Sequence, residues 1–321
     1  MGTLETLLSP VILFFVLGVF AAAVRSDLAI PEAMAKAMSL FLMAAIGLKG
    51  GVQVAAAGFS TGMMAAGAAG LVLSFVLPFL AFAALRGFGR LDSLNAGAVA
   101  AHYGSVSVVT FATASEVLER GGMPPAGYMV AVLALMETPA IVSGLLLAQR
   151  GSRSEARAGG HLWREVFFNG SVVLLLGAFA IGVVIGKEKY EPIAPMFTGL
   201  WSGVLCLFLL DMGLIAVRRL WDSRAVTLRL GLLAIALPLV NGSIGALVGN
   251  FIGLDVGSAA ALSILAASAS YIAVPAAMRL ALPKADAGLY LSMSLAITFP
   301  FNVVFGIPLF IALSQTLESW L

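Results

Sequence analysis

The sequence predicts an all-α integral membrane protein whose ten transmembrane helices form two inverted repeats of five, with the fourth and ninth helices broken. Three observations support this prediction. Apolar residues make up 61% of the 321 residues and charged residues only 11%, against about 25% charged in a soluble domain. Ten apolar runs of spanning length follow one another. Two of them contain clusters of small polar residues, which are costly in hydrocarbon unless every polar group finds a partner.

The ten runs are bounded by polar residues, proline or glycine, and a helix needs about 20 apolar residues to cross a bilayer. They cover residues 7–24, 31–56, 60–85, 93–118, 124–149, 166–186, 195–217, 228–251, 255–280 and 286–315. The alanines at 21–23 resemble a signal-peptide cleavage site. However, the residues before the first run include Glu5 and no Lys or Arg, whereas a signal peptide begins with positive charge. We therefore interpret this run as a retained helix.

The distribution of basic residues predicts a plasma-membrane protein with both termini outside and the central connector in the cytoplasm. With the N-terminus outside, fourteen of the 18 Lys and Arg residues fall on the inner side, as is typical of cytoplasmic loops. The polar connector at 150–165 divides the chain into a five-helix repeat at 1–149 and a second at 166–321. An odd number of spans in each half means that related halves must be inverted.

The two halves share a spacing of polar and breaking residues. In each half an Ala-Gly dipeptide lies twelve residues before a proline, Pro139 or Pro300, and a polar cluster lies 30 to 35 residues before the same proline. The clusters are GSVS at 104–107 and SAS at 268–270. Inverted repeats with paired broken helices are typical of secondary transporters, which bind substrate at the midplane where those helices meet.

We expect the polar clusters to be the substrate site. A broken helix frees N–H groups at the start of its second half, and the helix dipole attracts an anion there. Freed carbonyls and Ser or Thr oxygens suit a hard cation such as sodium. The predicted anion-binding residues are Gly104, Ser105, Val106, Ser107, Ser268, Ala269 and Ser270. The alternative is that these small residues only let helices pack closely.

Sodium is the predicted coupling ion, and its predicted ligands are Glu137, Thr110 and Asn302. Glu137 lies in an apolar run just before Pro139, and carboxylates in the membrane are expensive and usually functional. Glu137 and Asn302 could instead pair with backbone groups freed by the nearby prolines. We expect no organic cofactor and no other metal.

Three further polar residues each allow two interpretations. Asp211 either has a function or forms an ion pair with Arg218. Lys49 either attracts anions or extends its amine to the interface. His102 is either a hydrogen-bonded core residue or a proton carrier.

Other functions are less consistent with the sequence. It contains no GxSxG, HExxH, Walker or CxxC motif, so we expect no enzyme. The basic residues form no block, so nucleic acid is not an expected partner. An anion channel is the remaining rival, although it would need a continuous polar face that the runs lack outside the two clusters.

Five segments give the chain a family resemblance. They are IPEAMAKAMSLFLMAAIGLKGG (30–51), GSVSVVTFATASEVLE (104–119), METPAIV (136–142), LAASAS with its following proline (265–275) and GIPLFIALSQTL (306–317). The chain resembles the sodium-dependent bicarbonate transporters of the cyanobacterial type.

The resemblance implies sodium-coupled bicarbonate uptake by a homotrimer in the lipid bilayer, with substrate held between the two broken helices. It also implies a small PII-like regulator on the cytoplasmic side, and it supports a role for Glu137, where the family has an acidic residue. Two departures stand out. The family has an aspartate in the second polar cluster, near the position of Tyr271, and a longer central loop than residues 150–164. Another small anion, such as a short carboxylate, is the alternative substrate.

Overall fold

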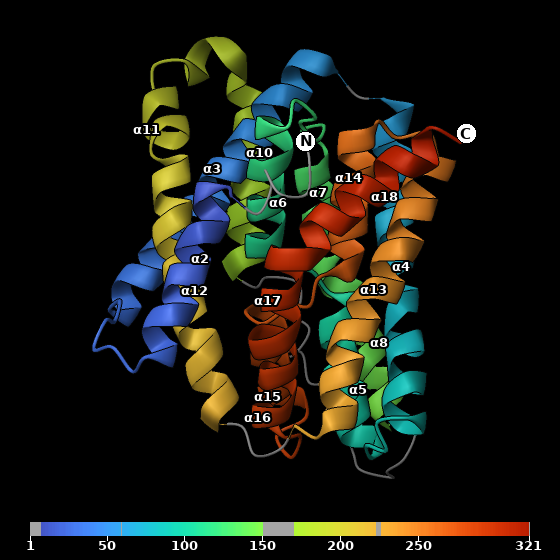
Figure 1. Ribbon diagram of the computed structural model, residues 1–321. Coiled ribbons are helices and arrows are strands. Elements are labelled where there is room, and N and C mark those ends of the chain that lie inside the picture. The colour runs from blue at the N-terminus through green and yellow to red at the C-terminus, as the bar shows by residue number, and fades with distance from the viewer. Residues whose placement is uncertain (1–7, 59, 150–169, 223–225, 321) are drawn as a thin grey trace.

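The computed structural model describes residues 8–58, 60–149, 170–222 and 226–320 (Figure 1). All regular secondary structure in these residues is helical, which confirms the all-α prediction. The connector predicted at 150–165 lies outside the described residues. The helices are α2 (Pro10–Ala23), α3 (Glu32–Ala57), α4 (Thr61–Gly87), α5 (Ser93–Gly104), α6 (Val108–Arg120), α7 (Met129–Leu135), α8 (Glu137–Gln149), α10 (Gly170–Tyr190), α11 (Ala194–Gly199), α12 (Trp201–Asp222), α13 (Leu228–Phe251), α14 (Val256–Ala267), α15 (Ala273–Ala281), α16 (Ala287–Leu291), η1 (Ser292–Thr298), α17 (Phe299–Phe301), η2 (Asn302–Gly306) and α18 (Ile307–Glu318).

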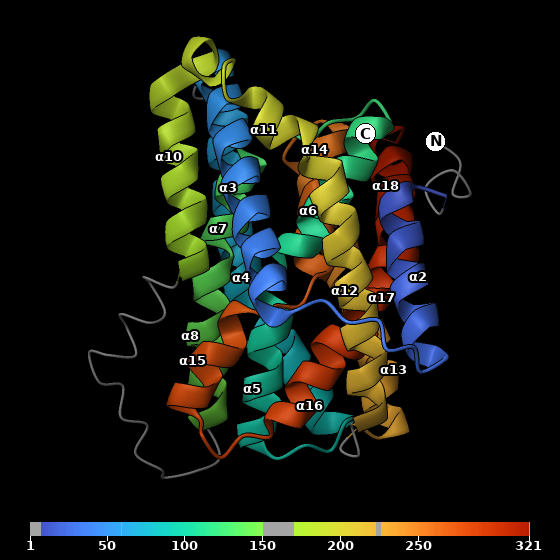
Figure 2. The same cartoon turned by 90° about the vertical axis from the view of Figure 1, so that its left-hand side faces the viewer.

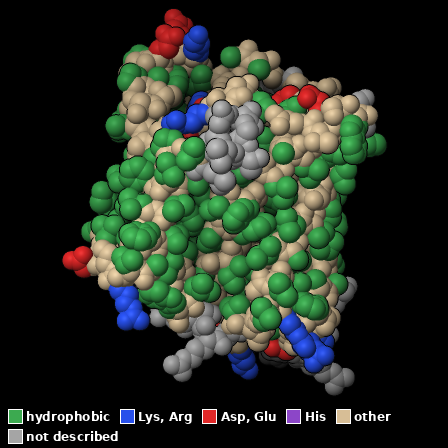
Figure 3. Space-filling view, in the orientation of Figure 1, with side chains coloured by type: hydrophobic (Ala, Val, Ile, Leu, Met, Phe, Trp, Pro, Cys, Tyr) green, Lys and Arg blue, Asp and Glu red, His purple; other side chains and the backbone are tan. Residues whose placement is uncertain are grey.

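Seven helical segments of the described chain are long and apolar enough to cross a membrane. They are Glu32–Ala57, Thr61–Gly87, Met129–Gln149, Gly170–Tyr190, Ala194–Trp221, Leu228–Phe251 and Ala287–Glu318, and α2 and α14 are shorter apolar helices. Hydrophobic side chains cover the middle of the face in Figure 3, and charged side chains lie toward its two ends. The chain is therefore a multi-pass membrane protein.

The helices form two groups that face each other (Figures 1 and 2). We call α2, α3, α10, α11 and α12 the panel, and the remaining helices the core bundle. In the panel, α3 packs along α10 and α2 along α12. Glycines allow these close approaches: a Cβ on Gly51 would lie 2.0 Å from the carbonyl oxygen of Phe179, and one on Gly18 would lie 2.1 Å from that of Leu210. Small residues have this role in many membrane helix pairs.

Two pairs of half-helices lie at the centre of the core bundle. The first halves, α5 and α14, both begin with an aspartate cap: Asp92 accepts from the Asn95 N–H and Asp255 from the Ser258 N–H, each at 2.9 Å. Aspartate is a preferred residue at this position because it satisfies an amide that has no partner within the helix. The α5 helix ends at Gly104 and α6 starts at Val108, whereas α14 ends at Ala267 and α15 starts at Ala273.

The last apolar run differs from a regular helix in a way that the sequence did not indicate. Two π-helical segments, η1 and η2, flank the short α17. Pro300 lies in α17 and lacks the N–H that a regular helix uses at that point. Such π-helical turns are frequent at functional sites, and η2 begins with the predicted sodium ligand Asn302.

Candidate functional site

The two polar clusters meet where the broken helices cross. The Ser107 N–H donates to Ser268 Oγ at 3.0 Å, and the Ser270 N–H donates to the His102 carbonyl at 2.9 Å. All three serines are buried. The structure thus brings together two segments that are more than 150 residues apart in the chain, and each break supplies a partner for the other.

Ser107 organises the first break through its hydroxyl group. Its Oγ caps α6 by accepting from the Thr110 N–H at 3.2 Å, and it accepts from Thr110 Oγ1 at 2.9 Å. Ser268 Oγ in turn donates to the Leu265 carbonyl at 2.8 Å. The predicted sodium ligand Thr110 is therefore linked to Ser268 through Ser107, whose hydroxyl group contacts Thr110 and whose amide contacts Ser268. The Ser107 amide, predicted as an anion donor, is already paired with Ser268.

Other amides at the breaks remain without an acceptor among the described residues. In the first break these are Val106, Val108 and Val109, and in the second they are Ala269, Tyr271, Ile272 and Ala273. All except Ile272 are buried. A buried unpaired N–H costs free energy comparable to a lost hydrogen bond. The crossing therefore concentrates N–H donors from the starts of α6 and α15.

Two asparagines support the breaks in matching ways. Asn241 of α13 donates from Nδ2 to the Tyr103 carbonyl at 3.0 Å, and Asn302 donates to the Ala267 carbonyl at 2.9 Å. These carbonyls lie at the C-terminal ends of α5 and α14. Both Oδ1 atoms are buried and have no partner among the described residues. Asn241 was not among the predicted site residues, although a lone amide in an apolar run was a signal that could have identified it.

The remaining predicted residues lie beside the first break. Ser105 Oγ donates to the backbone carbonyl of Glu137 at 3.2 Å, and Glu137 is buried at the start of α8. Gly104 faces α4: a Cβ there would lie 2.3 Å from Cγ of Pro78. This glycine is therefore needed for helix packing, which is the alternative that the sequence left open for the cluster.

The structure separates the alternatives for His102 and Asp211. His102 Nδ1 lies 2.7 Å from the Ala98 carbonyl oxygen, and its ring stacks on Tyr290 with centroids 4.6 Å apart. This geometry favours the core interpretation. Of the two interpretations of Asp211, the ion pair with Arg218 is not formed among the described residues: Arg218 donates to the Leu28 carbonyl at 2.8 Å, and Asp211 Oδ2 has no partner there.

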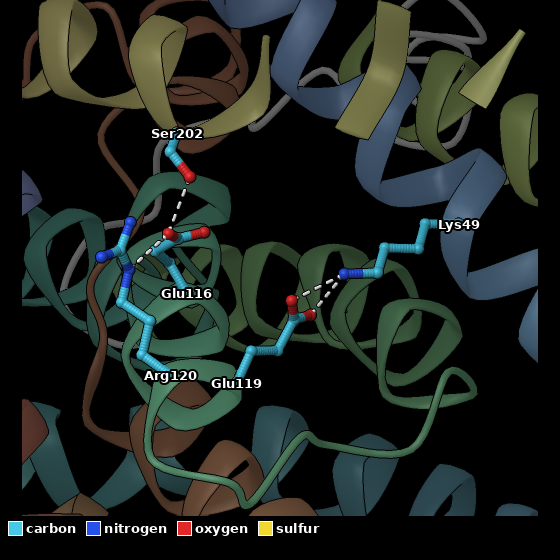
Figure 4. Close-up of polar contacts among 5 residues, drawn as sticks. All are labelled: Lys49, Glu116, Glu119, Arg120 and Ser202. Atoms are coloured by element: carbon cyan, nitrogen blue, oxygen red, sulfur yellow. Dashed lines mark hydrogen bonds and ion pairs between the residues drawn. The ribbon is translucent and has the colours of Figure 1, made fainter. Parts of the chain in front are cut away.

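Lys49 forms an ion pair that neither of its two interpretations included. Its Nζ forms an ion pair with both carboxylate oxygens of Glu119, at 2.6 and 2.7 Å (Figure 4). Beside this pair, the buried Glu116 accepts from Arg120 Nε and from Ser202 Oγ, each at 2.7 Å.

Two cavities lie between the panel and the core bundle. The Lys49 cavity has a volume of about 350 Å³, and the Lys36 cavity about 270 Å³. The first is lined by Ala45, Ile46, Lys49, Ser115, Glu116, Glu119, Arg120, Tyr190, Phe197, Thr198, Trp201 and Ser202. The second is lined by Lys36, Ser39, Leu40, Met43, Gly170, Ser171, Ile272, Ala273 and Ala276. Helix α3 contributes to both, and the Lys36 cavity reaches the start of α15 at the second break.

Comparison with known proteins identifies the family. No curated protein matches the chain. Residues 10–315 match the model of one protein family, which covers nearly the whole chain and confirms the resemblance found in the sequence. This is a family of transporters, so the chain is not an enzyme. The chain belongs to the Na⁺-dependent bicarbonate transporter superfamily.

Proposed function

We propose that the protein imports bicarbonate together with sodium and binds both at the crossing of the broken helices. The observation that carries this proposal is the set of unpaired amides at the starts of α6 and α15, which face no acceptor among the described residues. Helix N-termini bind anions through such N–H groups and the helix dipole.

The chemistry of the crossing suits a small anion of single charge. The donors are the amides of Val108, Val109 and Ala273 and the hydroxyl group of Ser270; the Ser105 hydroxyl group could join them only by leaving the Glu137 carbonyl, to which it donates at 3.2 Å. None of the residues from 104 to 110 or from 268 to 275 is Lys or Arg. Neutral donors bind an anion without the strong attraction of a fixed cation, so release on the far side stays rapid. The proposed substrate residues remain Gly104, Ser105, Val106, Ser107, Ser268, Ala269 and Ser270, with Gly104 acting through packing.

Sodium would use oxygen atoms around the same crossing. We assign it Thr110, Asn302 and Glu137, because hard cations prefer hydroxyl, carbonyl and carboxylate oxygens. Asn302 Oδ1 has no partner among the described residues, and Thr110 Oγ1 lies 2.9 Å from Ser107 Oγ. A cation bound beside the anion lowers the cost of bringing negative charge into the membrane, which couples the two ions.

Movement of the core bundle against the panel would provide alternating access. The two cavities lie on the two sides of the crossing along α3, so each is suited to be one access path. Two inverted repeats, at 1–149 and 166–321, would let the halves exchange conformations. We place both termini outside and the connector at 150–165 in the cytoplasm, from the distribution of Lys and Arg. A homotrimer and a PII-like regulator remain proposals from the family resemblance.

Transport by purified protein in liposomes tests this function. Labelled bicarbonate should accumulate only with an inward sodium gradient, and excess unlabelled bicarbonate inside should stimulate uptake of label. Uptake that ignores sodium, or that protons drive equally well, would overturn the coupling. Uptake that does not saturate and shows no stimulation from the far side would indicate a channel. Competition by short monocarboxylates distinguishes the alternative substrate class.

A further inference from the structure

The two cavities differ in the polar contacts that cross them. At the Lys49 cavity, two contacts join α6 of the core bundle to the panel: Glu119 to Lys49 of α3, and Glu116 to Ser202 of α12. Figure 4 shows both acidic side chains projecting from α6 toward panel helices. Among the described residues no other ion pair joins the panel to the core bundle, and Lys36 forms none at the other cavity.

The Lys49 cavity is lined by the far part of α6, the helix that starts at the crossing. Ser115 and Glu116 line the cavity, and Ser107 caps the start of the same helix. Eight residues of helix from Ser107 to Ser115 span about 12 Å. The cavity is therefore one short helical segment away from the unpaired amides.

These contacts can break without leaving a buried charge unpaired. Lys49 and Glu119 are each about one-third exposed, at 37% and 34% of their side chains, so water can solvate both charges when they separate. Glu116 is more buried, at 7%, but keeps Arg120 of its own helix as a partner when Ser202 moves away. Neither carboxylate would be left buried without a partner if the panel moved away from α6.

We propose that Lys49, Glu119, Glu116 and Ser202 form the outer gate of the transporter. In the described conformation the gate is closed: the ion pair and the serine hydroxyl group hold α6 against α3 and α12. Opening it would connect the Lys49 cavity, and through it the crossing, to the outside, because on α6 the gate residues Glu116 and Glu119 lie farther from the crossing than Ser115. The assignment of this gate to the outer side rests on the orientation given in the proposed function. The contacts themselves can be tested without knowing the substrate.

Labelling of an introduced cysteine tests the gate. In a Cys206→Ser background, Ser115→Cys places a thiol in the wall of the Lys49 cavity. A membrane-impermeant thiol reagent applied outside should label it slowly. Adding Glu119→Gln or Lys49→Met should raise the labelling rate about 5- to 10-fold, and Ser202→Ala about 2- to 3-fold. The exchange Lys49→Glu with Glu119→Lys should return the rate close to its starting value.

Matched controls come from the end of α10. Glu188→Gln and Lys189→Met change exposed charges outside the cavity lining and should leave labelling unchanged. Equal rates in the parent, the Glu119→Gln and the Lys49→Met proteins would overturn the gate. Because either single variant breaks the ion pair, one that folds is sufficient. A protein that does not transport bicarbonate but shows these labelling rates would contradict only the proposed substrate.

Discussion

The first break spans residues 105–107 and leads into a long, capped half-helix, whereas the second spans 268–272 and leads into a short one. Ser107 caps α6 with its side chain, but α15 has no side-chain cap and only a 3.5 Å contact from the Val274 N–H to Ser270 Oγ. The second break depends instead on other elements: the His102 carbonyl holds the Ser270 amide, and Asn302 holds the end of α14. The first break thus has a local cap in addition to its tertiary contacts, whereas the second has tertiary contacts but no side-chain cap, so we expect the second to respond more to bound ions.

The largest effect should come from the packing of the first break. Gly104→Val should prevent stable folding or lower the thermal midpoint strongly, because the new side chain would overlap the ring of Pro78, and overpacking typically costs about 1–3 kcal/mol or more. The measurement is thermal unfolding of the purified protein. Gly231→Ala is the control, since a Cβ there meets no atom within 4 Å. Equal stability of the two variants would show that Gly104 does not pack as described.

The two asparagines sharpen the comparison between the breaks. Asn302→Ala should raise the sodium concentration for half-maximal uptake by about 10-fold or more, as loss of a charge-assisted contact predicts. Asn241→Ala should destabilise the protein by about 1–3 kcal/mol through the unpaired Tyr103 carbonyl, without that shift in sodium dependence. Sodium titrations of uptake measure the first effect and unfolding the second. The same shift in sodium dependence in both variants would contradict the role of Asn302 as a sodium ligand.

The smallest effects on stability are expected from Ser107 and Ser270, one serine at each break. Ser107→Ala removes the cap of α6 and should lower the free energy of unfolding by about 1–2 kcal/mol. Ser270→Ala removes only the weak contact to Val274 and should cost less than about 0.5 kcal/mol. Denaturation of both variants under the same conditions makes the comparison. A larger cost for Ser270→Ala would mean that its hydroxyl group, rather than its backbone amide, supports the second break.

Much of the membrane architecture could be predicted from the sequence. The apolar runs at 31–56 and 228–251 agree with α3 and α13 within a residue, because length and hydrophobicity alone decide whether a helix can cross a bilayer. The breaks near Gly104 and Ser268 were also predicted, since Gly and Ser clusters are costly inside an apolar helix. The internal form of the last run was not predicted, because nothing in the sequences of η1 (SMSLAIT) and η2 (NVVFG) distinguishes a π-helical turn from an α-helical one.

The partners of polar side chains could not be predicted from the local sequence. Lys49 and Glu119 are 70 residues apart, and Ser107 and Ser268 are 161 apart. Nothing in either local sequence indicates the other, and the ion pair considered for Asp211, with the charge nearest in the chain, is not formed among the described residues. The sequence by itself determined that the chain lies in a membrane and where the two polar clusters interrupt its helices, because these depend on the local cost of polar groups in hydrocarbon. Only the tertiary structure decided which amides stay unpaired and which charges join the panel to the core bundle, because those depend on how separate helices pack.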